Sequence, residues 1–306
     1  MTQSTKRPGE DYRGPVLVLG ATGQQGGATA RALLRRPRRV RALVRDARGS
    51  GARALADAGA DVVEGDFADR QSLHAAMSGA DGVFSVQPNS GSPGSGVSDE
   101  DEVRFGRLVA DLAVETGVRH LVYSSAAILS KSPTGVTNLD CKLEIEAHIG
   151  GLPIASTIIR PATFMELLAR PDFWSSDATL TFFVSPDHSA ELIAADDIGR
   201  VAAAILDDRD RFAGRVINLA GDELTGAEIG AAIGMAVGRA VAYRRFPDVL
   251  LSRSPPLKRT VRLFEEGRAS GNAAVAELSR QFGQLTTLDD WLAGPARERI
   301  ASAIRA

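Results

Sequence analysis

The stretch GATGQQGG, residues 20–27, follows the apolar run PVLVL at residues 15–19 and decides the fold of this chain. Its glycines have the spacing of the turn by which a strand enters a helix beneath a dinucleotide. Gly20 permits the tight exit from the strand, Gly23 lets the backbone approach a pyrophosphate, and Gly26 lets helix and strand pack closely. The helix N-terminus adds N–H donors and a partial positive charge. The predicted contacts of this turn are Gly20, Thr22, Gly23, Gln24, Gln25 and Gly26.

Short apolar runs alternate with helix-like segments from residue 15 to about residue 160. The runs are VLVLG (16–20), VRALV (40–44), DVVEGD (61–66), DGVFSV (81–86), HLVYSS (120–125) and IASTIIR (154–160). Apolar strands without clean alternation, interleaved with helices, indicate a parallel sheet that is covered on both faces. Right-handed crossovers then make it a doubly wound sheet of the Rossmann type.

The chain divides by composition into three parts. Residues 1–14 are polar and lack an apolar signal core, so we expect a disordered tail. Residues 15–160 form the predicted dinucleotide-binding Rossmann domain, and residues 161–306 a smaller mixed α/β region that is packed on it across a cleft. The loops at 89–98 and 130–137 follow strands, which places them at the edge where open α/β sheets bind ligands.

The bulk composition excludes several classes of partner. The chain has 36 Lys and Arg against 38 Asp and Glu, so its net charge of −2 gives no general attraction to nucleic acid or anionic membranes. We find no apolar run long enough to span a bilayer, which needs about 18 residues. The single cysteine, Cys141, cannot support a disulfide framework, and a reducing cytoplasm is expected. The histidines share no ligand spacing, so no metal site is predicted.

Basic side chains are concentrated between residues 31 and 53, where nine arginines occur with one acid, Asp46. This segment could attract polyanions, or it could be a solvated helix face with one or two anion-binding arginines. We favour the second interpretation.

The second strand ends in VRALVRD, residues 40–46, where an NAD-preferring site has an acid that binds the ribose 2′-hydroxyl. Arg45 instead falls 19 residues after Gly26, and a guanidinium there can bind a 2′-phosphate. Asp46 is the competing candidate, one residue later. The sequence therefore favours NADP(H) over NAD, with an exposed strand-end charge as the alternative for Arg45.

The third strand ends in GDF at residues 65–67. Asp66 could accept a hydrogen bond from the adenine amino group while Phe67 lies near the ring. Asp66 could equally be the N-cap of the following helix RQSLHAAM. Both readings stay open at this point.

Several motifs together resemble one known family. GATGQQGG, VRD, EGDF, CKLEIEAHI with Lys142, IIRPATFMELL and IAADDIGRVAAAIL occur in the order seen in NmrA-like proteins, which are atypical short-chain dehydrogenases/reductases. The resemblance covers roughly residues 15–295. It implies a Rossmann domain that binds NADP(H), a small C-terminal domain, and a substrate cleft between them.

The usual proton donor of the superfamily is missing. Standard members use Tyr-x-x-x-Lys, in which the lysine lowers the pKa of the phenol. The residues four positions before Lys6, Lys131, Lys142 and Lys258 are Thr2, Ala127, Asn138 and Ser254. Proton exchange by that tyrosine is therefore excluded.

Lys142 is the main catalytic candidate. On a helix it shares one face with Asn138 and Glu146. A buried stripe of Cys141, Ile145 and Ile149 leaves Lys142 free to point into the cleft. The resemblance implies that Lys142 bonds the nicotinamide ribose; the alternative is a surface pair with Glu146. Asn138 stands where many NmrA-like proteins have histidine, and its amide can orient a carbonyl or water but cannot supply a proton.

The segment RPATF, residues 160–164, follows the sixth strand and should reach the nicotinamide end through Pro161, Thr163 and Phe164. Phe164, Trp174 and Phe183 are candidates for an apolar substrate wall, although such aromatic residues are more often plain core. Ser124 and Ser125 end the fifth strand, where they could orient a substrate or cap the strand end.

Two functions fit these features. The first is an NADPH-dependent reductase of a small apolar acceptor such as a quinone, enone or imine, with Lys142 and Asn138 as catalytic residues. The second is a non-enzymatic NADP(H) sensor that controls a protein partner through the loops at 89–98 and 130–137. We favour the reductase because of Lys142 and the apolar residues near it.

Overall fold

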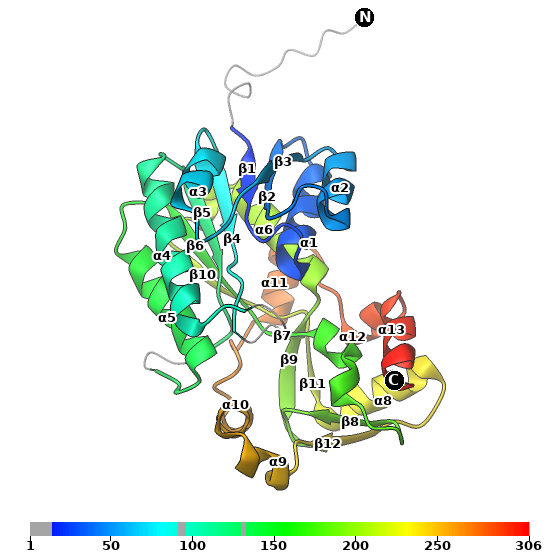
Figure 1. Ribbon diagram of the computed structural model, residues 1–306. Coiled ribbons are helices and arrows are strands. Elements are labelled where there is room, and N and C mark those ends of the chain that lie inside the picture. The colour runs from blue at the N-terminus through cyan, green and yellow to red at the C-terminus, as the bar shows by residue number, and fades with distance from the viewer. Residues whose placement is uncertain (1–13, 91–95, 130–132, 306) are drawn as a thin grey trace, which may run out of the picture.

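The computed structural model describes residues 14–90, 96–129 and 133–305 (Figure 1). Of the predicted disordered tail, only Gly14 lies within the described residues. The loops at 89–98 and 130–137 also lie partly outside them.

The main sheet has seven parallel strands in the order β10-β6-β5-β4-β1-β2-β3 (Figure 1). Their bounds are β1 Val16–Val18, β2 Val40–Val44, β3 Asp61–Glu64, β4 Gly82–Ser85, β5 His120–Ser124, β6 Ser156–Pro161 and β10 Val216–Leu219. The order reverses between β1 and β4, which creates the switch point at which doubly wound sheets bind dinucleotides. The predicted Rossmann-type sheet is confirmed.

Helices cover both faces of this sheet (Figure 1). They are α1 Gln24–Leu34, α2 Ser50–Asp57, α3 Arg70–Met77, α4 Asp99–Glu115, α5 Thr137–Gly150, α6 Ala195–Asp207, the single turn α7 Arg209–Phe212, and α11 Val275–Phe282. Val16 and Val18 enter the core with α1, α2 and α6, whereas Leu17 enters the core with α3, α4 and α5. Because successive strand residues point to opposite faces, apolar residues at every position bury both faces.

The remaining elements build a smaller region with a core of its own (Figure 1). Its sheets are β11-β9-β7 and β12-β8, from β7 Thr163–Phe164, β8 Thr179–Phe182, β9 Ser189–Ile193, β11 Asp222–Thr225 and β12 Ala242–Arg245. Its α-helices are α8 Gly226–Val237, α9 Asp248–Arg253, α10 Pro255–Glu265, α12 Leu288–Leu292 and α13 Ala296–Ala303. Two 3₁₀ helices, η1 Met165–Ala169 and η2 Pro171–Phe173, connect β7 to β8.

Part of residues 161–306 lies with the main sheet rather than with the smaller region. Strand β10 extends the sheet beside β6, where Val216 pairs with Ile158. Helix α6 packs on α1 so closely that a Cβ on Gly199 would lie 2.3 Å from the carbonyl carbon of Ala28. After residue 160 the chain therefore returns to the main sheet, so segments of the Rossmann domain and of the smaller region alternate along the sequence.

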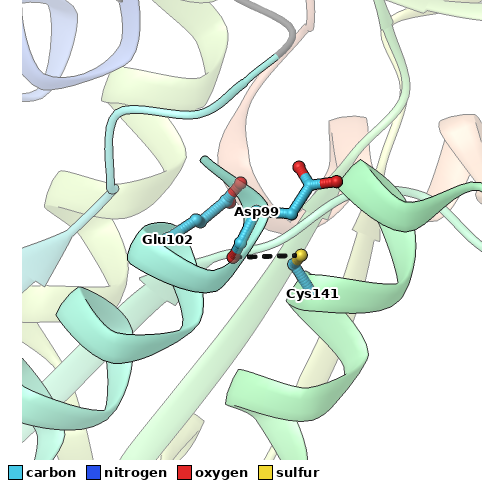
Figure 2. A group of neighbouring side chains, drawn as sticks. All are labelled: Asp99, Glu102 and Cys141. Atoms are coloured by element: carbon cyan, nitrogen blue, oxygen red, sulfur yellow. Dashed lines mark hydrogen bonds between the residues drawn. The ribbon is translucent and has the colours of Figure 1, made fainter. Parts of the chain in front are cut away.

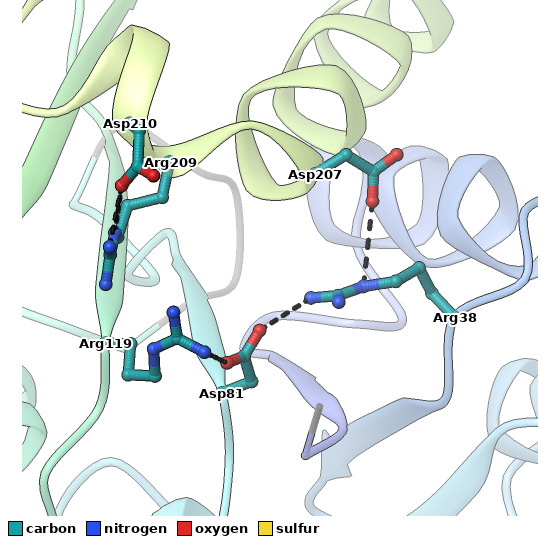
Figure 3. A network of polar contacts seen from close by, with 6 residues as sticks. All are labelled: Arg38, Asp81, Arg119, Asp207, Arg209 and Asp210. Atoms are coloured by element: carbon teal, nitrogen blue, oxygen red, sulfur yellow. Dashed lines mark hydrogen bonds and ion pairs between the residues drawn. The ribbon is translucent and has the colours of Figure 1, made fainter. Parts of the chain in front are cut away.

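A buried arginine forms ion pairs that connect α6 to the amino-terminal edge of the sheet (Figure 3). The Arg38 guanidinium, whose side chain is 7% exposed, lies 3.0 Å from Asp81 and 3.6 Å from Asp207 at the end of α6. Arg119 binds the other oxygen of Asp81 at 3.1 Å. These residues precede β2, β4 and β5, so one network joins three strand starts to a helix end.

A buried carboxylate holds the chain between α10 and α11. Glu191 of β9 is 6% exposed and accepts hydrogen bonds from the N–H groups of Gly271 at 2.8 Å and Ala273 at 2.5 Å. Each carboxylate oxygen of Glu191 accepts one of these hydrogen bonds. The side chain thereby satisfies backbone amides of this irregular segment that have no strand to pair with.

We expect Glu191→Ala to lower the free energy of unfolding by about 3 kcal/mol, because two buried amides lose their acceptor. Urea unfolding followed by circular dichroism measures the change. Asp57→Ala is the matched control, since Asp57 is exposed at the end of α2 and its loss should cost less than about 0.5 kcal/mol. Equal effects of the two substitutions would contradict the role of Glu191.

His120 at the start of β5 should make stability depend on pH. Burial, and secondarily the charge of Arg209, lowers the pKa of His120 from 6.5 to about 4, and its Nε2 bonds Thr157 Oγ1 at 2.8 Å. The fold therefore requires the neutral imidazole, so its contribution is complete above pH 6.5 and is lost as the pH falls towards 4. Between roughly pH 8 and pH 5, the free energy of unfolding of the unsubstituted protein should fall by about 2 kcal/mol more than that of the His120→Asn variant. Urea unfolding at each pH measures the difference. Parallel stability curves for the two proteins would refute this expectation.

Candidate functional site

The glycine turn has the geometry that a dinucleotide requires. Gly20 has a φ of +61°, in the left-handed region that favours glycine, and its carbonyl accepts the N–H of Gly23 at 2.9 Å. A Cβ on Gly26 would lie 2.1 Å from the Gly20 oxygen, so only glycine fits there. Helix α1 can therefore pack closely on the turn that follows β1.

The N-terminus of α1 is free of protein caps. Gly23 is its N-cap and offers no side chain, and the first turn contains no acid. The first amides of a helix lack carbonyl partners within it, so they are donors for an anion. Thr22 and Gln24 are exposed beside them. Gln25 reaches across the sheet edge, where its Oε1 accepts a 2.6 Å hydrogen bond from the Ser124 hydroxyl of β5. The contacts of these residues with a pyrophosphate stay a prediction.

Arg45 lies exposed at the carboxyl end of β2 and forms no ion pair with any described residue. Its competitor Asp46 accepts the N–H of Arg48 at 2.9 Å, which closes a local turn. The uncapped start of α2 lies next to the glycine turn, since a Cβ on Gly51 would be 3.3 Å from Thr22 Cγ2.

Other arginines of the basic segment have acidic partners far along the chain. These pairs are Arg31–Asp196, Arg36–Asp207, Arg38–Asp81 and Arg41–Asp61. Most of these pairs involve the amino-terminal edge of the sheet, opposite the glycine turn. The pairing supports a largely structural role for the segment and leaves Arg45 available on the ligand side.

Asp66 does not cap the helix that follows it. Its Oδ1 accepts the N–H of Ala68 at 2.8 Å, and Asp69 is the N-cap of α3 through the N–H of Gln71. The Phe67 ring packs on Phe105, with 5.7 Å between centroids. The capping alternative for Asp66 was therefore wrong, while the adenine contact stays a prediction.

Lys142 of α5 forms a buried ion pair that the sequence analysis missed. Its Nζ lies 2.5 Å from Glu102 Oε1 of α4, and the two side chains are 16% and 1% exposed. The alternative partner Glu146 instead binds Arg160, with contacts of 2.9 and 2.5 Å. The proposed surface pair of Lys142 with Glu146 was therefore wrong.

Glu102 could have been found from its position in the sequence. It lies in the acidic first turn of α4, and it is followed at helical spacing by the buried Phe105 and Val109. An acid at the head of an apolar stripe is expected to be buried and to need a cation. Burial raises the pKa of Glu102, and the charge of Lys142 opposes that rise.

Asp99, Glu102 and Cys141 lie together between α4 and α5, with one possible ligand atom of each within 4.8 Å of the others (Figure 2). Burial above all raises the pKa of the Cys141 thiol to about 12, so it stays protonated. Lys142 already binds Glu102, and the Asp99 carboxylate accepts the Ser90 hydroxyl. We assign no metal to this group.

Asn138 lies half-buried in the first turn of α5, one helical turn before Lys142. Its side chain forms no hydrogen bond with a described residue. Pro161 ends β6, and Thr163 and Phe164 form β7, which pairs with β9. These residues therefore lie where the main sheet passes into the smaller region, as expected for the nicotinamide end, although their contacts with a cofactor remain a prediction.

The other proposed wall residues pack within the smaller region. The Trp174 indole donates to the Leu168 carbonyl at 2.9 Å, and the Phe183 ring stacks on Phe264 at 5.2 Å. These contacts favour the core interpretation for both. Two surface hollows of about 440 and 370 Å³ are lined by none of the predicted site residues, so the cleft stays a prediction.

Known protein families and curated proteins resemble this chain over much of its length. The family model described as "NmrA-like family" matches residues 13–292. The chain belongs to the NmrA-like family. The NmrA-like family domain-containing oxidoreductase FrzB of Cladobotryum sp is 33% identical, over 66% of this chain and 67% of FrzB. Within the described residues, no helix is long and apolar enough to cross a bilayer.

Solved structures show the same fold. NmrA, a negative transcriptional regulator solved with NADP, has a TM-score of 0.77 at 19% identity, covering 95% of this chain and 98% of that one. The NADPH-dependent quinone oxidoreductase QOR2 of Escherichia coli, solved with NADPH, has a TM-score of 0.71 at 23% identity, covering 91% and 98%. The expected fold and family are thereby confirmed.

Proposed function

We propose that this protein is an NADPH-dependent reductase of a small apolar acceptor such as a quinone, enone or imine. The observation that carries the proposal is the Lys142–Glu102 pair, a buried charge at the carboxyl edge of the sheet. Helices α4 and α5 both begin at that edge, because they follow strands of a parallel sheet. The hydrogen bond from Ser124 to Gln25 connects the glycine turn to the same edge.

The cofactor would lie across the switch point. The first turn of α1 would hold the pyrophosphate, Arg45 the 2′-phosphate, and Asp66 and Phe67 the adenine. Lys142, Pro161, Thr163 and Phe164 would line the nicotinamide end. When bound, NADPH supplies the hydride.

The protein's own contribution would be electrostatic. The Lys142 ammonium would stabilise the negative charge that develops on the acceptor, and Asn138 would orient its carbonyl or a water. No Tyr-x-x-x-Lys pair is available, so the completing proton would come from water or from the substrate. A quinone suits this chemistry, because its reduced oxygens need little help with protonation.

Related proteins support the reductase over the sensor. The chain shares 33% identity with an NmrA-like oxidoreductase, FrzB, over two thirds of its length. The sensor hypothesis rests on the fold that the chain shares with the regulator NmrA and on loops that lie partly outside the described residues. It becomes the preferred reading if the protein binds NADPH without oxidising it.

Purified protein mixed with NADPH and a panel of quinones, enones and imines should oxidise the nucleotide, followed by its absorbance. We expect Lys142→Met to slow the reaction by about 100-fold, since one charge-stabilising group is lost. Lys258→Met, at an exposed position on α10, should leave the rate unchanged. Intact NADPH binding with no oxidation above background across the panel would rule out the reductase.

Arg45→Ala should weaken NADPH binding by about 10- to 100-fold, because a charge-assisted hydrogen bond to the 2′-phosphate is lost. NADH affinity should not change, so the ratio of the two dissociation constants, measured by nicotinamide fluorescence, tests the assignment. Arg35→Ala removes an equally exposed charge at the far end of α1 and should alter neither affinity. An unchanged ratio in Arg45→Ala would show that another group selects the cofactor.

A further inference from the structure

Several buried side-chain polar atoms have no hydrogen-bond partner among the described residues, and four of them belong to α4 or to the carboxyl ends of β4 and β5. These four are Gln87 Oε1, Glu102 Oε2, the Tyr123 hydroxyl and Ser125 Oγ. Strand alternation puts Ser125 on the same face as Tyr123, and Ser85, two residues before Gln87, pairs in register with Tyr123. Buried polar groups without partners on one face of the sheet are consistent with a surface that meets a polar ligand.

This face of the sheet is covered by α4 and α5, which carry Glu102 and Lys142. Tyr123 packs in one core with Val109 of α4 and Ile145 of α5. Its pKa is raised well above 10, mainly by burial and then by the charge of Glu102. The Tyr123 hydroxyl therefore lies within electrostatic reach of the carboxylate that binds Lys142.

Helix packing alone does not account for the buried pair. Removing two charges from water is costly, and an apolar pair of similar volume is often equally stable. An exposed salt bridge, Arg107–Glu144 at 2.7 Å, already joins α4 to α5 on the solvent side. A role of the Lys142 ammonium in the reaction would account for the retention of the pair.

Glu102 is the described acid that binds the Lys142 ammonium, and the acids nearest to this pair have other partners. Glu146, one turn further along α5, is bound to Arg160 through both oxygens. Asp99, in the first turn of α4, accepts the Ser90 hydroxyl. The location of the Lys142 charge is therefore set by one carboxylate from the neighbouring helix.

We propose that Glu102 is a positioning residue for the reduction, which holds the Lys142 ammonium beside the reacting atoms. This inference rests on the proposed reductase function. In the step concerned, a hydride leaves the dihydronicotinamide and bonds to the acceptor, whose oxygen or nitrogen becomes negative and then takes a proton from water. Lys142 faces that negative charge without losing a proton, and Glu102 acts only through Lys142.

The kinetic test compares Glu102→Gln, Lys142→Met and the double variant at saturating NADPH. Glu102→Gln should lower kcat by about 10- to 100-fold, with little change in the acceptor KM, because the amide leaves the ammonium without a fixed charge partner. In the Lys142→Met background, the same substitution should have no further effect on kcat. Glu144→Gln removes an exposed acid from the same helix interface and should retain full activity.

A second measurement does not require turnover. Reductive methylation followed by mass spectrometry should modify Lys142 more slowly than the exposed Lys258, and Glu102→Gln should raise the Lys142 rate to that of Lys258. The Glu102→Gln, Lys142→Met double variant has neither charge of the pair. If its unfolding midpoint matches that of the unsubstituted protein, a loss of kcat cannot be attributed to loss of folding.

The outcomes separate the two proposals. If the unsubstituted protein oxidises NADPH and Glu102→Gln keeps its kcat, the positioning role is wrong while the reductase stands. The positioning role would also be wrong if Glu102→Gln lowered kcat by the same factor with and without Lys142→Met. If no acceptor is reduced, the proposed function fails, and an unchanged Lys142 methylation rate in Glu102→Gln would refute the positioning role independently.

Discussion

The rest of the structure depends on the contact between the backbones of Gly20 and Gly26. A Cβ at position 26 would overlap the Gly20 oxygen at 2.1 Å, so α1 can pack closely on the turn that follows β1 only if this residue is glycine. That close packing leaves the first amides of α1 at the switch point, and no described side chain caps them by a hydrogen bond. Two residues later, Ala28 receives α6 by a second close approach, at Gly199. Two close backbone approaches on α1 therefore set the start of this helix and the packing of the later chain against it.

Charge is distributed differently at the two edges of the sheet. At the amino-terminal edge, Arg38 is buried between Asp81 and Asp207, and a ligand would have to break these contacts to use it. At the carboxyl edge, Arg45 is exposed and its neighbour Asp46 is occupied by its own turn. The net charge of the whole chain is only −2, so it does not attract anions in general. An anion can bind where an arginine has no acidic partner. The same basic segment can thus stabilise the fold at one edge and remain open to a phosphate at the other.

The sequence predicted features that depend on near neighbours. The glycine turn and β2 follow from residues within one strand–helix unit, and the structure places them as expected. Features that depend on distant residues were not predicted. Lys142 and Glu102 are 40 residues apart, so helical spacing suggested Glu146, which shares the helix of Lys142. Strand β10 was placed with the smaller region because nothing in its own residues specifies β6 as its partner.

The identity of the partner of Lys142 limits the chemistry that the proposed reductase could perform. In Tyr-x-x-x-Lys sites, the lysine acts on a phenol, whereas here its ammonium faces the carboxylate of Glu102. Tyr123 cannot replace that phenol, because burial and the nearby carboxylates raise its pKa well above 10 and favour the neutral hydroxyl. In the proposed reductase, Lys142 would therefore supply an ammonium fixed by Glu102, and Tyr123 would not supply the proton. Under that proposal, acceptors whose anions are protonated readily by water would suit the protein better than simple ketones, whose alkoxides need a nearby acid.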